Sequence, residues 1–303
     1  MKKKLIRRIA TLATTAVLCV GACAMFAGCS SNHPEVTITY TFGAEETEYK
    51  VTYTLSRVDA PNTVKHFLEL ADAGFYDGLC IHDYDSDHLY SGGYRFGEND
   101  ALEAVDYFTW VKDYEKNENY KFTQSVWMND EAQTPLYTVY GECIEGNGNT
   151  PENGRENRHS KGALVMYYTD KSNFNERVQT IRNDGGENDT TKYYKYNSAT
   201  SLFYTYLGSS SSSLDKQYCV FGKVKDYDEL QALLDAIEDY KTAQIPEDET
   251  EEDTDYSFTE EIAIENVNEY EPFDDLKYGD VTATYNTPVE MPIIIKSVKV
   301  NKY

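Results

Sequence analysis

The sequence is poor in positive charge. Its 303 residues include 28 lysines and arginines against 52 aspartates and glutamates, so the formal net charge is −24 at pH 7. A surface of this sign repels nucleic acids and anionic lipid headgroups, because both carry negative charge. We therefore expect no nucleic-acid partner and no membrane attachment through headgroup contacts.

Cysteine is also scarce. Two of the six cysteines belong to an N-terminal segment that is predicted to be removed, and Cys29 lies directly after that segment. The three that remain are Cys80, Cys143 and Cys219. An odd number allows one disulfide at most. Two of the three lie in predicted strands, where a buried free thiol is the common outcome.

The sequence also lacks the patterns of nucleophilic catalysis and of phosphate binding. No Ser/His/Asp or Cys/His constellation stands out, and no phosphate-binding glycine loop. The carboxylates of Asp83, Asp85 and Asp87 alternate along the chain and could gather oxygen ligands for calcium. An EF-hand loop would need glycine in place of His88 and glutamate in place of Tyr94. We predict an exposed acidic loop without a metal, with a bound cation as the alternative, and no cofactor.

The first residues have the order of an export signal. Five basic residues among the first eight are followed by an apolar run over residues 9–26 and by Gly28 and Cys29. This order predicts a lipoprotein signal peptide over residues 1–28, a lipidated Cys29 and a short tether over residues 29–34. The alternative is an uncleaved signal anchor, since eighteen apolar residues can just span a bilayer. Either way we expect the protein on the extracytoplasmic face of the cell membrane. Removal of the signal lowers the formal charge to −29, because the five basic residues leave with it.

Two kinds of hydrophobic periodicity follow the tether. Residues 36–42 and 49–55 alternate with period two, which predicts a hairpin closed by residues 44–47. Pro61 stands where a first helical turn would begin, and the next apolar residues recur with helical spacing until Gly74. A tight turn over residues 75–78 and a buried strand from Leu79 are expected next.

Residues 60–93 carry the most specific pattern in the chain. They resemble the cyclophilin family of peptidyl-prolyl isomerases, whose pattern is roughly APxTVxNFxxLxxxGxYDGxxFHRVIxxFxxQGGD. The matching residues are Ala60, Pro61, Thr63, Val64, Phe67, Leu70, Gly74, Tyr76, Asp77, Gly78, His82, Gly92 and Gly93. Residues 161–166 are similar to the family's KGxLSMA, residues 214–224 to its LDGxHxVFGKV, and residues 292–298 to its last strand.

The resemblance implies a mainly β fold over residues 35–303. The expected architecture is a closed antiparallel β-barrel capped by two helices, with insertions near residues 96–134, 170–196 and 241–291. Apolar spacing over residues 101–108 suggests a helix in the first insertion, and the second insertion reads as a long polar loop. Asp228 is predicted to cap the second barrel helix, with Leu230, Leu233, Leu234 and Ile237 on its apolar face.

The residue that carries the family's chemistry is replaced in this sequence. Rotation about an X–Pro bond has a barrier near ~20 kcal/mol, and the family's arginine lowers it by donating hydrogen bonds to the substrate. Here the histidine of the motif is kept as His82, but the arginine position holds Asp83. A carboxylate has no donor when ionised, and a negative group ~4 Å from developing negative charge is unfavourable by roughly 4 kcal/mol.

Other groove positions differ as well. The resemblance assigns to the peptide groove His82, Asp83, His88, Leu89, Ser91, Tyr168, Leu202, Tyr204, Leu214 and Tyr218. Outside the retained His82, only Leu214 and the aromatic character of Tyr204 keep the family's residue type. No residue is therefore predicted as a catalytic group with a clear role.

Two functions remain open at this point. The first is a membrane-tethered cyclophilin-like protein that binds proline-containing or extended segments of exported proteins, or a protein partner, with isomerase catalysis weak or lost. The alternative is an active peptidyl-prolyl isomerase that assists the folding of secreted proteins, with Arg95 supplying the missing guanidinium. The two differ in whether any guanidinium reaches the groove.

Overall fold

The computed structural model describes residues 31–97, 100–123, 127–128, 139–140, 142–143, 156–167, 179–182, 191–193, 198–246, 256–265 and 282–303. The predicted signal peptide, Cys29 and the predicted groove residue Tyr168 lie outside these ranges. Contacts group Ser31–Tyr303 into one unit. Among the described helices, none is both long and apolar enough to span a bilayer.

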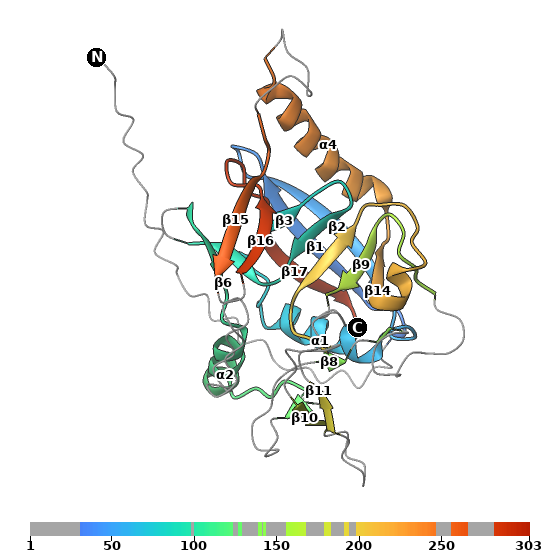
Figure 1. Ribbon diagram of the computed structural model, residues 1–303. Helices are drawn as coiled ribbons and strands as arrows, with labels where there is room; N and C mark the ends of the chain where they lie inside the picture. The colour runs from blue at the N-terminus through green and yellow to red at the C-terminus, as the bar shows by residue number, and fades with distance from the viewer. Residues whose placement is uncertain are drawn as a thin grey trace. The chain divides into compact units, whose positions relative to one another are not determined.

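The unit is built on an eight-stranded sheet in which every neighbouring pair is antiparallel (Figure 1). In spatial order its strands are β17 (Ile294–Lys302), β1 (Glu35–Phe42), β2 (Thr47–Leu55), β14 (Cys219–Val224), β9 (Ala163–Met166), β13 (Phe203–Tyr206), β4 (His88–Ser91) and β3 (Asp83–Tyr84). The predicted hairpin is present as β1 and β2, with the turn at residues 43–46.

The sheet curls so that its two edges approach each other. Residues 79–81 precede β3 at one edge, and β17 is the other edge. A single bridge pairs Cys80 with Ile294, flanked by hydrogen bonds from Ile81 N to Ile293 O (2.9 Å) and from Ile295 N to Leu79 O (2.7 Å). The mainly β, antiparallel, barrel-like prediction is confirmed, although this seam is one bridge instead of a continuous ladder. The expected strand from Leu79 is correspondingly reduced to that bridge.

Helix α1 (Pro61–Asp72) buries the apolar face that its sequence pattern predicts. Pro61 occupies its first turn, and Val64, Phe67, Leu68 and Ala71 are all buried. The ring of Phe67 meets the rings of Tyr76, Phe203 and Phe221 at centroid distances of 4.9, 5.4 and 5.1 Å. Phe67 therefore joins the helix to two strands and to the turn after the helix.

Helix α4 (Tyr227–Gln244) is the second predicted helix and packs on β1 and β2. Leu230, Leu233 and Ile237 are buried, as expected, while Leu234 is half-buried. The cap is Asp226 and not the predicted Asp228, because Asp226 is the last extended residue and its carboxylate accepts from the backbone N–H of Asp228 at 3.0 Å. In Figure 1, α1 and α4 lie at opposite ends of the strands.

The first insertion differs from its sequence-based prediction. Residues expected to start a helix instead form β6 (Leu102–Ala104), which pairs with β5 (Tyr94–Phe96). Helix α2 (Tyr107–Glu118) begins after them because the Asp106 carboxylate caps it, accepting from Thr109 N at 2.9 Å. The rings of Tyr107 and Trp110 then pack on Phe75.

The other described elements are short. They are β7 (Trp127–Met128), β8 (Val139–Tyr140), β10 (Gln179–Arg182), β11 (Thr191–Tyr193), β12 (Ser198–Ala199), α3 (Leu214–Gln217), β15 (Glu260–Glu265) and β16 (Thr282–Thr287). The second insertion thus contains strands β10 and β11 where a polar loop was expected, and the third contains the β15–β16 hairpin. Cys80, Cys143 and Cys219 are buried thiols outside any disulfide, which confirms the prediction made for the strand cysteines Cys80 and Cys219.

Candidate functional site

A pocket of about 250 Å³ opens beside β3 and β4. It is lined by His82, Asp83, His88, Tyr90, Tyr167, Leu202, Thr284 and Tyr285. Residues 82–90 belong to the stretch 60–93 that resembles the family pattern. Residue 167 follows β9, residue 202 precedes β13, and residues 284 and 285 belong to β16. The third insertion therefore contributes one wall of the pocket.

Strand β4 shows which of its predicted groove residues reach the pocket. Side chains alternate between the two faces of a strand. His88 and Tyr90 line the pocket, whereas Leu89 is 1% exposed in the core and Ser91 is fully buried, donating from Oγ to Cys80 O at 2.7 Å. The structure thus places Leu89 and Ser91 in the barrel interior instead of the groove. The same alternation, applied to the sequence, would have found Tyr90.

Asp83 is hydrogen-bonded to β16 of the third insertion. Its Oδ1 accepts from the backbone N–H of Asn286 at 2.9 Å, and its Oδ2 lies 3.4 Å from His88 Nε2. Burial raises the pKa of this carboxyl, but the hydrogen bonds from His88 and Asn286 outweigh it, so the net pKa lies below its ordinary value. The group is therefore an anion at neutral pH, and it holds β16 against the edge strand β3.

His82 forms the floor of the pocket as a neutral ring. It is 1% exposed, and its ring lies 4.4 Å from that of Tyr94 and 4.8 Å from that of Tyr285. Burial lowers its pKa to about 3, although the charge of Asp83 acts in the opposite direction. Its Nδ1 has no hydrogen-bond partner among the described residues.

The acidic loop uses its own carboxylates. Asp85 Oδ1 accepts from the backbone N–H groups of Asp87 (2.6 Å) and His88 (2.8 Å), and it lies 3.0 Å from His88 Nδ1. In the described part of the chain, no three His, Cys, Asp or Glu side chains are grouped so that they could hold a metal ion. Of the alternating acids, Asp85 thus stabilises the turn, and Asp83 contacts β16.

A tyrosine-rich patch borders the pocket at Tyr90. The ring of Tyr204 lies 4.6 Å from Tyr90 and 6.2 Å from Tyr218, and Leu214 packs on the same cluster. The structure thus brings the predicted groove residues Tyr204, Leu214 and Tyr218 into one cluster, but they do not line the pocket itself.

This patch is supported by a buried hydrogen-bond chain that the sequence did not reveal. His159 is fully buried, with Nδ1 3.1 Å from Asp215 Oδ1 and Nε2 3.1 Å from the Tyr204 hydroxyl. With the proton on Nδ1, Nε2 accepts from that hydroxyl, so Asp215 fixes the orientation of Tyr204 through His159. No periodic signal links these residues, because His159 and Asp215 are 56 positions apart.

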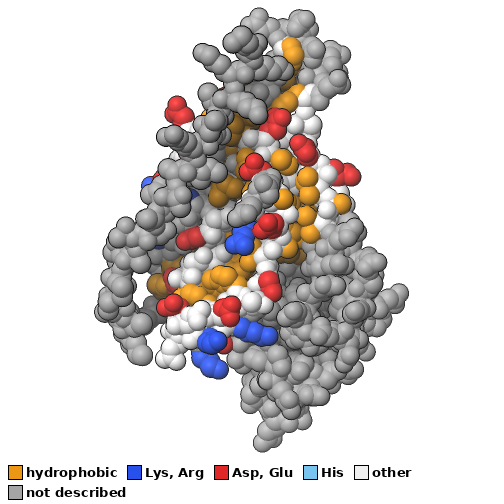
Figure 2. Space-filling view, turned by 90° about the vertical axis from the view of Figure 1, so that its left-hand side faces the viewer, with side chains coloured by type: hydrophobic (Ala, Val, Ile, Leu, Met, Phe, Trp, Pro, Cys, Tyr) orange, Lys and Arg blue, Asp and Glu red, His pale blue; other side chains and the backbone are white. Residues whose placement is uncertain are grey.

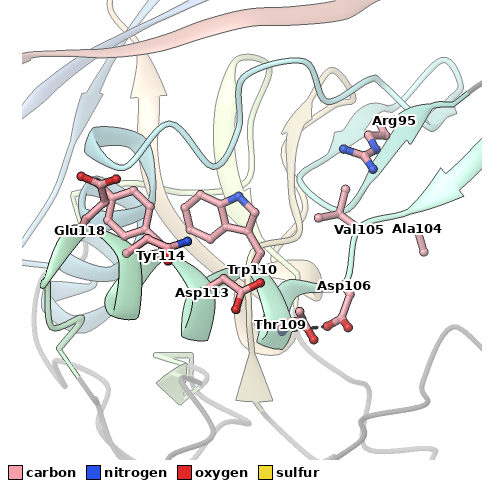
Figure 3. Close-up of a pocket in the computed structure, with 10 residues that line it drawn as sticks. Arg95, Ala104, Val105, Asp106, Thr109, Trp110, Asp113, Tyr114 and Glu118 are labelled. Carbon is pink, nitrogen blue, oxygen red and sulfur yellow. Dashed lines mark hydrogen bonds between the residues drawn. The ribbon is translucent and has the colours of Figure 1, made fainter. Parts of the chain in front are cut away.

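Arg95 does not reach the pocket. It follows Tyr94 on β5, and because successive side chains point to opposite faces, Tyr94 packs on His82 while Arg95 lines a separate pocket of about 500 Å³. Figure 3 shows Arg95 at one end of that second pocket, above Val105, with Glu118 of α2 at the other end. None of the described residues that line the pocket at Asp83 is a lysine or an arginine.

Comparison with known proteins identifies one family. Residues 41–269 match the family model described as cyclophilin type peptidyl-prolyl cis-trans isomerase/CLD. The crystal structure of a cyclophilin type isomerase from Cryptosporidium parvum is similar at 16% identity and a TM-score of 0.41, over 89% of this chain and 99% of that one. The same enzyme in the presence of the dipeptide Ala-Pro gives a TM-score of 0.40 with the same identity and coverage. No curated protein matches. Because the family model spans most of its length, the chain belongs to the cyclophilin-type peptidyl-prolyl cis-trans isomerase family.

Proposed function

We propose that this protein is a membrane-tethered cyclophilin-type protein that binds proline-containing or extended segments of exported polypeptides, with isomerase catalysis weak or lost. The observation that carries the proposal is the Asp83 carboxylate, which stands in the pocket where the family has its arginine. The walls supplied by Tyr90, Tyr167 and Leu202 still offer apolar surface to a proline ring or an extended chain.

Catalysis and binding make different demands on this pocket. Binding needs a concave apolar surface with a few polar groups, whereas isomerisation also needs a donor that favours the twisted amide. The described lining provides a neutral imidazole, an anionic carboxylate and tyrosines, but no guanidinium. This distribution supports retained binding and reduced turnover.

A protease-coupled proline isomerisation assay tests the proposal on the soluble chain that begins at Ser30. We expect turnover close to the uncatalysed rate, together with measurable binding of proline-containing peptides by fluorescence anisotropy. Ordinary turnover would favour the alternative, an active isomerase that assists the folding of secreted proteins. Absence of any peptide binding would contradict the proposed function itself.

The proposed tether predicts the effect of changing one cysteine. Cys29→Ala is expected to abolish lipid labelling and to leave the precursor unprocessed or release the protein from membranes, because the acylated thiol is lost. Cys23→Ala, within the same signal segment, is the matched control and should be labelled and processed normally. Metabolic labelling with a fatty acid, followed by membrane fractionation, measures both. Normal labelling of the Cys29→Ala variant would refute the lipid anchor.

A further inference from the structure

We propose that the pocket at Asp83 selects a cationic side chain, lysine or arginine, in the polypeptide segment that it binds. The inference rests on the proposed binding function of the same pocket and names the residue type that the pocket prefers. In the bound state the cationic group lies against the Asp83 carboxylate, and its aliphatic stem lies against the tyrosine rings of the wall.

The first support is the net charge of the pocket. Asp83 and Asp85 both contact His88, at 3.4 and 3.0 Å, so these three groups together are negative whether or not His88 is protonated. His82 stays neutral, because burial lowers its pKa to about 3. No lysine or arginine is among the described lining residues, and His88 is paired with the two carboxylates, so a ligand cation meets no unpaired positive charge from these residues.

The second support is the acceptor capacity that Asp83 keeps. An ionised carboxylate offers about four lone-pair positions. Two interactions of Asp83 are with Asn286 N and His88 Nε2, and its side chain remains 20% exposed while lining the pocket. A lysine or arginine head can therefore bond to Asp83 without displacing the contact to β16.

The third support is the aromatic wall. The rings of Tyr90 and Tyr167 lie 5.7 Å apart at 76°, and Tyr285 lines the same pocket. Aromatic faces attract cations, and an apolar stem packs well against them. A volume of about 250 Å³ is smaller than most small-molecule sites, which suits one or two side chains of a bound segment.

The fourth support is the rigid placement of β16. The Tyr285 hydroxyl lies 3.0 Å from that of Tyr94, and Thr287 Oγ1 donates to His82 O at 2.7 Å. Together with the Asn286 contact to Asp83, these bonds fix the hairpin of the third insertion at the mouth of the pocket. The β15–β16 hairpin and Asp83 are therefore held together as parts of the same pocket. Figure 2 shows acidic side chains scattered over the described surface of one face, with basic side chains mainly toward its lower part. The excess of acids over the whole chain, 52 against 28 basic residues, favours the approach of basic segments.

Matched peptides test the preference. Three fluorescent peptides differ in the residue before proline, as Lys-Pro, norleucine-Pro and Glu-Pro, and binding to the soluble chain from Ser30 is measured by anisotropy at low ionic strength. We expect the lysine peptide to bind about tenfold more tightly than the norleucine peptide, and the glutamate peptide to bind more weakly than both. The lysine advantage should shrink as salt is added.

Two variants assign the preference to the pocket. Asp83→Asn keeps an oxygen for the Asn286 N–H but removes the charge, so the lysine advantage should disappear while norleucine binding is kept. Asp87→Asn removes an exposed carboxylate of the same turn that does not line the pocket, and it should keep the advantage. Tyr285→Leu should weaken lysine binding more than norleucine binding, and it provides the test if Asp83→Asn fails to fold.

Each outcome decides a separate point. Equal binding of all three peptides by the wild type overturns the cationic preference but leaves the proposed function intact. A lysine advantage that survives Asp83→Asn, or survives Tyr285→Leu where that variant is the test, also overturns the inference. Failure of every peptide to bind contradicts the proposed function, and with it the preference.

Discussion

The wild-type chain is expected to isomerise an Ala-Pro peptide at least about 10²–10³-fold more slowly than a family member that has the arginine. Removal of one pre-organised donor from a site of this kind commonly costs that factor. The replacement here is an anion, because the hydrogen bonds to Asp83 from His88 and Asn286 lower its pKa below the ordinary value. A negative charge ~4 Å from developing negative charge adds roughly 4 kcal/mol of unfavourable energy at an effective dielectric near 20.

Restoring the donor alone is expected to recover a small part of this loss. Asp83→Arg supplies a guanidinium, but it removes the acceptor of the Asn286 N–H, and Tyr285 still stands at the wall. Asp83→Ala is the matched control, since it also removes the carboxylate and this acceptor while adding no donor. The excess rate of Asp83→Arg over Asp83→Ala in the protease-coupled assay measures the effect of the guanidinium.

Two results would tell against this account. Wild-type turnover near that of an ordinary cyclophilin would mean that another group supplies the donor. Retained peptide binding with no turnover in either the wild type or Asp83→Arg would mean that the shape of the pocket, more than its charge, prevents catalysis.

Phe67→Ala is expected to lower the free energy of unfolding by about 3–5 kcal/mol. The side chain is fully buried, and its ring contacts Tyr76, Phe203 and Phe221 at 4.9–5.4 Å. Its loss removes apolar contacts and leaves a cavity between α1 and the sheet, which close packing cannot fill without moving the helix. Urea denaturation measures the change as a lower midpoint with an unchanged slope.

A surface position provides the control for that measurement. Val58 lies just before α1 and is 37% exposed, so Val58→Ala should change stability by no more than about 0.5 kcal/mol. An unchanged midpoint for Phe67→Ala, or an equal loss for both variants, would contradict the burial of Phe67 between α1 and the sheet.

Local sequence patterns predicted the first strands and the first helix correctly. Period-two alternation located β1 and β2, and the helical spacing after Pro61 located α1, because each pattern records which side of one element is buried. The predicted start of α2 was wrong because the apolar spacing of residues 101–108 continues across Asp106. The carboxylate of Asp106 caps the N-terminus of α2, so the helix begins after this residue and the residues before it form β6. Leu89 and Ser91 were assigned to the groove by alignment alone, whereas strand alternation turns them into the core.

The sequence by itself determined the family resemblance, the core of the barrel and the acidic residue at the arginine position. The tertiary structure alone decided what surrounds that acid. Asp83 meets Asn286 across 203 positions of chain, His82 meets Thr287 across 205, and Tyr204 is oriented by His159 and Asp215 from two other segments. The physical reason is that burial leaves a periodic trace within each element. The hydrogen bonds and ring contacts that build a pocket depend on which distant segments meet when the sheet curls, and such meetings leave no local period in the chain.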